Sequence, residues 1–263
     1  MLKIMIKIFF QIVIFLLGLI VGSFLNCIIW RISVKKSFLK GRSICPKCKH
    51  QLTFFNLIPL FSFLILKGKC RYCKKKISWQ YPLVELATGL IFLLISILFW
   101  NNIPLMVFLT IIFSFLIIIF VHDLKHLIIP DNVLLPAIII AGLYRIFEGL
   151  FIIKSYSSLY YLLSMAVPCG FFLLIYIFSK GKWIGFGDVK LAILLGLILG
   201  WPNILVGLFL SYLIGGIIGT GLVIFSKKHM KSEVPFAPFL IAGTMVAAFF
   251  GTPILNWYLG LIR

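Results

Sequence analysis

Hydrophobic residues fall in long blocks along the chain, separated by short polar stretches, and no alternating pattern typical of β-strands is present. The blocks predict helices at residues 7–30, 83–100, 104–122, 132–152, 159–179, 189–200, 203–225 and 237–260. Because about 20 apolar residues are needed to cross a bilayer core of about 30 Å, the pattern predicts an all-α, polytopic membrane protein with about eight transmembrane helices. The sixth block is short, so we expect that helix to begin partly in water.

The composition agrees with this class, since 62% of the residues are hydrophobic and 12% charged, whereas soluble domains carry about 25% charged residues. An ordinary soluble protein is therefore excluded. Lys3 and Lys7 precede the first apolar block, as in a secretory signal. That block exceeds 20 residues and lacks a cleavage site of small residues, so we expect a retained membrane anchor.

Basic residues are concentrated in four of the polar segments. Lys and Arg total 25 against six acids, a net charge of +19 that in a soluble protein would suggest nucleic-acid binding. Twenty of the 25 lie in segments on one predicted side of the membrane, namely 31–82, 123–131, 180–190 and 226–235. By the positive-inside rule these segments face the cytoplasm. Topology and attraction to anionic lipid explain the charge, and we expect no nucleic-acid partner.

The segment 31–82 contains two Cys-x-x-Cys pairs separated by 21 residues. This spacing is typical of a zinc site, because each pair gives two thiolates to one tetrahedral ion; the predicted ligands are Cys45, Cys48, Cys70 and Cys73. Four protein sulfurs leave no position for water, so the metal is expected to be structural. Disulfides or free thiols are the alternative, which a reducing cytoplasm disfavours.

These features divide the chain into a first transmembrane helix at 1–30, a cytoplasmic zinc module at 31–82 and a seven-helix core at 83–263. Cys27 and Cys169 lie inside apolar blocks, and packing explains both.

The chain has six carboxylates, each informative because acids in a membrane protein are costly and often functional; they are Glu85, Asp123, Asp131, Glu148, Asp188 and Glu233. Glu233 lies in a polar segment and is expected to be solvated. Glu148 follows Arg145 by three helical positions, which predicts an ion pair. Asp131 follows a proline at the start of a helix, where it is expected to act as the N-cap.

Asp123 and Asp188 are harder to explain as structural residues. Asp123 ends a helix, where the helix dipole disfavours a negative charge. Asp188 follows Gly185 and Gly187, so helix capping is one interpretation; a backbone turn that a substrate approaches closely is the other. The two acids are assigned to the same membrane face. Within hydrogen-bonding reach they would share one proton, and such a pair can activate water to attack a peptide bond.

The sequence resembles the type IV prepilin peptidases, intramembrane aspartyl proteases of the Gly-x-Gly-Asp class. The resemblance covers nearly the whole chain and rests on five motifs in order: GSFLN from Gly22, the two Cys-x-x-Cys pairs, YPLVEL from Tyr81, DLKHLIIPD from Asp123 and GFGDVK from Gly185.

The resemblance implies that Asp123 and Asp188 are the catalytic pair. It also implies a multi-pass protein of the bacterial inner membrane that cleaves the basic leader of prepilins or pseudopilins at the cytoplasmic face. Family members with the cysteine module also methylate the new N-terminus with S-adenosylmethionine, so we expect a bifunctional enzyme.

Three other residues are assigned from their positions. Glu85, beside the cysteine module, is a predicted contact for the methyl donor or the substrate amine; a structural pair with a nearby Lys or Arg is the alternative. Lys125 and Lys190 each follow a predicted catalytic acid by two residues, where they would tune its pKa or contact substrate. Otherwise they are ordinary basic residues at the ends of membrane spans.

Three alternative functions remain at this point. A peptidase without methyltransferase activity would use the cysteine module for bracing or docking. A transporter with a zinc module would usually place charges near the bilayer midplane and contain inverted repeats, and neither feature is evident. A zinc protease is disfavoured by the closed ligand set.

Overall fold

The structure is a computed structural model that describes residues 2–37, 41–152, 158–225 and 234–262. In this part of the chain the secondary structure is helical, apart from two isolated β-bridges in the cysteine segment. The predicted all-α class is therefore confirmed. Glu233 lies outside the described residues.

Seven helices within the described ranges are long and apolar enough to cross a membrane. They are α1 (Leu2–Ser33), α3 (Gln80–Leu98), α4 (Ile103–His126), α5 (Asp131–Phe147), α6 (Ser158–Ser179), α8 (Asn203–Phe225) and α9 (Ala237–Ile262). The remaining predicted span is α7 (Phe186–Leu199), whose 14 residues extend about 21 Å at 1.5 Å per residue. It is too short to cross the bilayer core by itself, in line with the short sixth block.

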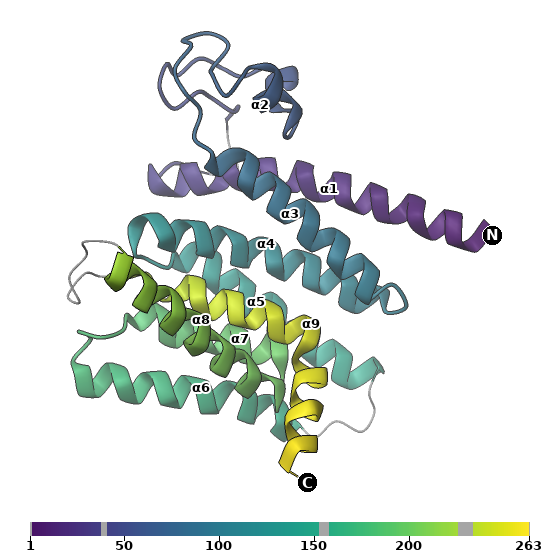
Figure 1. Ribbon diagram of the computed structural model, residues 1–263, viewed down its shortest axis with the longest axis vertical. Helices are drawn as coiled ribbons and strands as arrows, with labels where there is room; N and C mark the ends of the chain where they lie inside the picture. The colour runs from purple at the N-terminus through teal and green to yellow at the C-terminus, as the bar shows by residue number, and fades with distance from the viewer. Residues whose placement is uncertain (1, 38–40, 153–157, 226–233, 263) are drawn as a thin grey trace. The chain divides into compact units, whose positions relative to one another are not determined.

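The chain forms two compact units, Met1–Ile118 and Ile119–Arg263, with the boundary inside α4. In the first unit α1 and α3 pack together (Figure 1). A Cβ added to Gly18 would lie 2.8 Å from the Cα of Gly89, and one added to Gly22 would lie 2.7 Å from the Cα of Glu85. Glycines four residues apart thus let the two helix backbones approach closely, as in small-residue packing between membrane helices.

In the second unit α7 is the central helix. It contacts α5, α6, α8 and α9, which are grouped around it in Figure 1. Most of its residues are buried, and a Cβ added to Gly196 would meet the backbone oxygen of Ser164 on α6 at 2.1 Å. Because neighbouring protein surrounds it, α7 can be short without exposing its backbone to lipid.

The C-terminal end of α7 is held by Arg145 from α5. The Arg145 Nε donates a hydrogen bond to the Leu197 carbonyl at 2.7 Å, and Nη2 donates to the Ile198 carbonyl. The same guanidinium forms an ion pair with Glu148, which confirms the predicted pair. Carbonyls that have no partner within the helix are therefore satisfied from outside it.

Candidate active site and metal site

Asp123 lies in the last turn of α4, which continues to His126. Its side chain is buried, and its carboxyl faces the backbone N–H of Ala237, the first residue of α9. The neighbouring His122 is also buried, with its Nδ1 2.8 Å from the carbonyl oxygen of Ile128. His122 therefore ties the end of α4 to the segment that follows it, residues 127–130.

Asp188 is the third residue of α7 and is buried at the N-terminal end of that helix. Its Oδ2 accepts a hydrogen bond from the backbone N–H of Gly185 at 3.2 Å. The capping interaction considered for Asp188 is therefore present. This interaction uses one oxygen of the Asp188 carboxyl. It does not explain why Asp188 is buried close to a second acid, Asp123.

The structure brings Asp123 and Asp188 together. A Cβ added to Gly187 would lie 3.1 Å from the Cβ of Ile129, so this glycine lets the start of α7 approach the segment after α4. The two carboxyls are close enough to interact electrostatically. No direct hydrogen bond joins them among the described residues. They therefore lie near each other without the direct hydrogen bond considered from the sequence, and their catalytic roles stay a prediction.

Sequence reasoning missed a group of aromatic residues beside this pair. Tyr212 on α8 interacts electrostatically with Asp188. Its ring lies 6.5 Å from that of Phe172 and 5.6 Å from that of Phe236, measured between centroids. The sequence did contain one signal, because Tyr212 carries a hydroxyl within an apolar span. That signal does not show that Asp188, on another helix, is its neighbour.

Asp131 and Lys190 form an ion pair with each other. The N-cap of α5 is Pro130, with no side-chain cap, so the prediction that Asp131 caps this helix is wrong. Instead its two oxygens lie 2.8 and 2.9 Å from the Lys190 Nζ. Lys125 is exposed.

The two cysteine pairs form two knuckles of the same design, one at 44–51 and one at 69–76. In the first, the Cys45 N–H donates to the His50 carbonyl and the Cys45 carbonyl accepts from the Lys49 N–H. In the second, Cys70 makes the same two bonds with Lys75 and Lys74. Lys49 and Lys74 both have positive φ, and an isolated β-bridge closes each knuckle. The matching geometry directs both pairs of sulfurs to one point.

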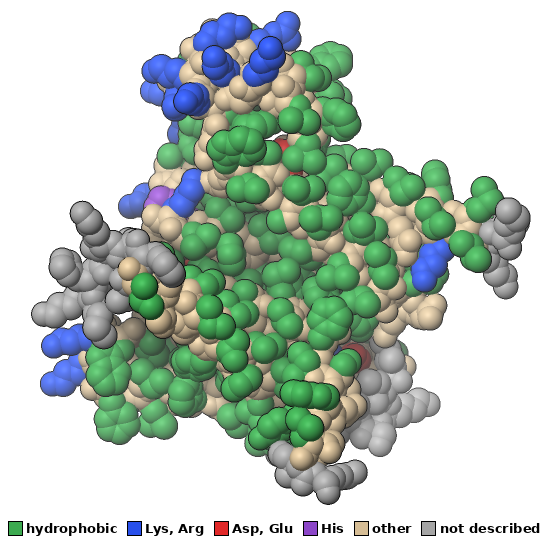
Figure 2. Space-filling model, in the orientation of Figure 1, with side chains coloured by type: hydrophobic (Ala, Val, Ile, Leu, Met, Phe, Trp, Pro, Cys, Tyr) green, Lys and Arg blue, Asp and Glu red, His purple; other side chains and the backbone are tan. Residues whose placement is uncertain are grey.

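The four cysteines form a group that could hold a metal ion. Their sulfur atoms all lie within 4.8 Å of one another, compared with about 3.8 Å expected between thiolates around tetrahedral zinc with Zn–S bonds of about 2.3 Å. Within the described chain the cysteines are free thiols, not disulfides. Figure 2 shows Lys and Arg side chains gathered over this segment, where they offset thiolate charge; those beside the ligands are Lys47, Lys49, Arg71 and Lys74.

The thiols also influence one another. Burial opposes ionisation of Cys70, but backbone N–H groups of Cys73 and Tyr72 point at its sulfur and lower the thiol pKa to about 7. At Cys48 the backbone N–H of His50 acts in the same direction; partial desolvation and the neighbouring thiols outweigh it and raise the pKa to about 11. Four thiolates therefore need a cation to ionise together, which fits a divalent metal.

Glu85 lies on α3, where its side chain is buried against the cysteine segment. Its Oε2 accepts a hydrogen bond from the Leu60 N–H at 2.9 Å, and its carboxyl lies close to the Ser23 hydroxyl. Among the described residues no Lys or Arg lies within ion-pair distance of Glu85, so the alternative interpretation, a structural pair with a basic residue, is wrong.

Two family models match the chain. The bacterial peptidase A24 N-terminal domain matches residues 16–99, and the type IV leader peptidase family matches residues 110–220. Among curated relatives, the prepilin leader peptidase/N-methyltransferase of Bacillus subtilis is 35% identical, covering 94% of this chain and 97% of that protein. The chain belongs to the type IV leader peptidase family. The resemblance seen in the sequence is confirmed.

Other curated relatives agree with this family. The prepilin leader peptidase/N-methyltransferase of Legionella pneumophila is 31% identical over 96% of this chain and 95% of that protein. The protein of the same name from Aeromonas salmonicida is 30% identical over 95% of this chain and 94% of its own length. No solved structure gives a significant match.

The type IV leader peptidase match contains both buried acids of the pair, and the N-terminal match contains the four cysteines and Glu85. The two sites described above therefore fall in separate domains of the family.

Proposed function

We propose that this protein removes the leader peptide from type IV prepilins or pseudopilins and then methylates the new N-terminal amine. Relatives named prepilin leader peptidase/N-methyltransferase, which align along nearly the whole chain, support both activities. The observation that carries the peptidase half is the pair of buried carboxyls, Asp123 and Asp188, which come within electrostatic range from different helices.

In the proposed cleavage, one carboxylate of the pair takes a proton from water while the other, protonated, donates a proton to the peptide carbonyl oxygen. The water oxygen bonds to the carbonyl carbon and a diol forms. As the carbon–nitrogen bond breaks, the leaving nitrogen takes the proton that the first carboxyl removed from water, and a diol hydroxyl returns a proton to the second carboxylate. Two neighbouring carboxyls favour the singly protonated state that this needs, because like charges repel. Gly185 would let an extended substrate approach the turn before α7, whereas Gly187, within α7, leaves room for Ile129.

The cysteine segment would hold a structural Zn²⁺ through Cys45, Cys48, Cys70 and Cys73, and the ion would stabilise the fold of both knuckles. For the second reaction we propose S-adenosylmethionine as methyl donor. An α-amine has a pKa of about 7.7 to 8.0, so a useful fraction is neutral and nucleophilic near neutral pH. The protein must then hold the amine in line with the donor methyl and exclude water; Glu85 remains our candidate contact for the amine or the donor.

We further propose that both reactions occur at the cytoplasmic face of the bacterial inner membrane. The excess of Lys and Arg in segments on one predicted side, 20 against 5, supports this orientation. A substrate helix would lie in the bilayer beside the spans, while its basic leader remained in water near the two acids.

The proposal is tested by incubating the membrane-reconstituted enzyme with a prepilin and S-adenosylmethionine and reading the product masses. The wild type should give a shortened product carrying an added methyl group. Asp123→Asn and Asp188→Asn should each lower cleavage by at least about 10² to 10⁴-fold, the contribution typical of general acid–base groups. A shortened product without the methyl group would leave only the peptidase half standing.

Asp131→Asn is the matched control, because Asp131 is a third acid of the same unit that pairs with Lys190 instead. It should retain cleavage. Near-normal processing by either Asp123→Asn or Asp188→Asn would refute the assignment of the pair.

A further inference from the structure

A set of large apolar side chains is exposed on the segment between the two knuckles. This segment contains the 3₁₀-helix η1 (Phe54–Leu57) and the short helix α2 (Phe61–Ile65). The exposed side chains are 62% to 78% accessible; they are Phe54, Phe55, Phe61, Leu64 and Ile65. Single exposed apolar residues need no explanation, but a run of this kind marks a surface that another apolar phase covers.

Two contacts attach this segment to membrane-spanning helices of the same unit. The Ser23 hydroxyl on α1 donates to the Leu57 carbonyl at 3.5 Å, and Glu85 on α3 accepts from the Leu60 N–H. Both helices are candidate membrane spans. At 1.5 Å per residue, Ser23 lies about 15 Å before the end of α1 and Glu85 about 7.5 Å after the start of α3. The segment therefore packs beside α1 and α3 at points inside their ends, not beyond them.

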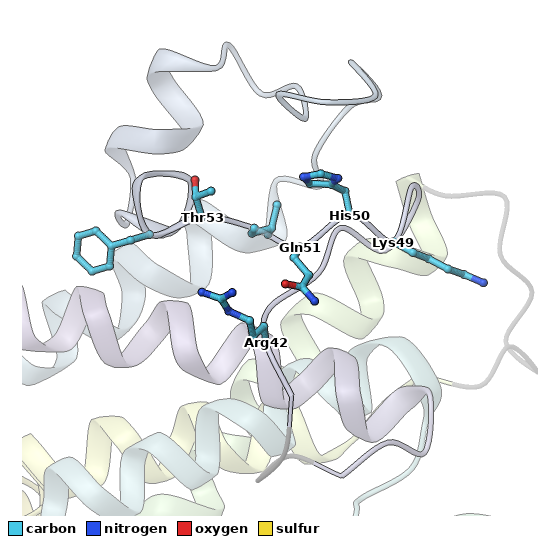
Figure 3. Close-up of a pocket in the computed structure, with 7 residues that line it drawn as sticks. Arg42, Lys49, His50, Gln51 and Thr53 are labelled. Atoms are coloured by element: carbon cyan, nitrogen blue, oxygen red, sulfur yellow. The ribbon is translucent and has the colours of Figure 1, made fainter.

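The charge around the segment complements an anionic lipid surface. Residues 31–82 carry 13 Lys and Arg and no acid. An open groove of about 570 Å³ adjoins the exposed apolar side chains and ends at Phe54. Figure 3 shows Arg42, Gln51 and Thr53 around this groove, with Lys49 extending to one side. Guanidinium, ammonium, amide and hydroxyl groups together can donate several hydrogen bonds to a phosphate.

We propose that the segment Phe54–Leu66 is an interfacial anchor that inserts into the membrane leaflet on its own side, and that the groove beside it binds an anionic phospholipid headgroup. Interfacial helices bury their apolar face about 5 to 10 Å into the boundary between headgroups and acyl chains, a distance similar to the roughly 7.5 Å along α3 from its first residue to Glu85. Lipid is also always close to this segment. Residues 34–79 are preceded by α1 and followed by α3, and both helices are candidate membrane spans. The proposed prepilin leader is basic, so this basic surface would repel it.

Glu85 has a defined part in this arrangement. Leu60 has a positive φ of 60° at the turn that leads into α2, and Glu85 accepts the hydrogen bond from its N–H. The carboxylate therefore holds the turn that separates η1 from α2 and fixes the anchor against α1 and α3.

The anchor is tested by photo-crosslinking of the full-length protein in nanodiscs of phosphatidylglycerol and phosphatidylcholine. The variants Phe61→p-benzoylphenylalanine and Ile65→p-benzoylphenylalanine place the probe on the exposed face, where the side chain makes few contacts that folding needs. Lys47→p-benzoylphenylalanine, on the exposed tip of the first knuckle, is the control. We expect lipid adducts at Phe61 and Ile65 and few at Lys47. Equal yields at all three positions, or adducts to protein in place of lipid, would overturn the anchor.

The groove is tested in the same nanodiscs from the ratio of anionic to zwitterionic lipid adducts. Arg42→Gln and Lys49→Gln should each lower that ratio about fivefold, since one cation near an anionic surface contributes about 1 kcal/mol. Lys75→Gln removes an equal charge from the other knuckle and should leave the ratio nearly unchanged. If Lys75→Gln has the same effect as Arg42→Gln, general charge attraction explains the preference and the headgroup site is refuted.

Discussion

Replacement of Arg145 by Ala is expected to destabilise the second unit strongly, although Arg145 binds the opposite end of α7 from Asp188. Arg145 holds two carbonyls at the end of α7 and pairs with Glu148. The Tyr161 hydroxyl also donates to Glu148, at 2.9 Å. Without the guanidinium, Glu148 keeps that single neutral donor, and the carbonyls of Leu197 and Ile198 lose a charged one.

The magnitude follows from burial. The side chains of Arg145 and Glu148 are each 11% exposed, so water can replace little of the lost interaction. Breaking a buried pair by removing one partner costs about 3 to 5 kcal/mol, whereas an exposed pair contributes about 0 to 1 kcal/mol. We therefore expect the free energy of unfolding to fall by about 3 to 5 kcal/mol in Arg145→Ala.

The assay is denaturant unfolding of the protein in nanodiscs, followed by loss of helical circular dichroism, with a double-mutant cycle. Glu148→Gln keeps an acceptor for Tyr161 and removes the charge. If the pair is coupled as described, the double variant of Arg145→Ala and Glu148→Gln is less destabilised than the sum of the single variants, by about 0.5 to 3 kcal/mol.

A loss below about 1 kcal/mol in Arg145→Ala, the range of exposed pairs, would refute the reasoning. So would strict additivity in the cycle, because it would mean that Arg145 and Glu148 act independently.

Three further outcomes follow from the structure. Gly196→Ala should destabilise the α6–α7 packing by about 1 to 3 kcal/mol, as overpacking does, because its Cβ would meet a backbone oxygen at 2.1 Å. The control is Gly170→Ala, whose Cβ would meet nothing within 4 Å. This control should be neutral in the same unfolding assay. Cys45→Ser should impair methylation or stability more than leader cleavage, measured as product masses and melting temperature; equal loss of both activities in a well-folded variant would contradict this. Lys190→Gln should retain cleavage and lose at most about 1 kcal/mol, since its ion pair with Asp131 is partly exposed; a large loss of cleavage would instead support direct action of Lys190 on the acids or the substrate.

The helices could be predicted from the sequence because long apolar blocks leave few other structures available in a membrane. Each of the eight blocks became a helix, and the ends differ from the prediction by a few residues. The helices η1 and α2 were not predicted, because neither has the length or periodicity that a sequence pattern needs.

Partners of individual polar side chains were harder to predict, because they depend on segments that meet only in the folded chain. Asp131 had the sequence position of an N-cap, yet its partner is Lys190, 59 residues away. A pair with a basic residue was one of the two interpretations of Glu85, and its partner is a backbone N–H made available by an unusual turn at Leu60. By contrast, the Arg145–Glu148 pair was predicted correctly because its geometry is set within one helical turn.

The short length of α7 connects the fold to the proposed chemistry. A helix of 14 residues that faced lipid would leave backbone groups at its ends without partners, at a cost of several kcal/mol each. Here the C-terminal carbonyls receive donors from Arg145, and at the other end Asp188 accepts the Gly185 N–H. Both ends are therefore held by protein, and although Phe186 at the start of α7 is exposed, Asp188 two residues later is buried. That position keeps the Asp188 carboxyl buried beside Asp123, and it would supply the low-dielectric setting in which two carboxyls share a proton.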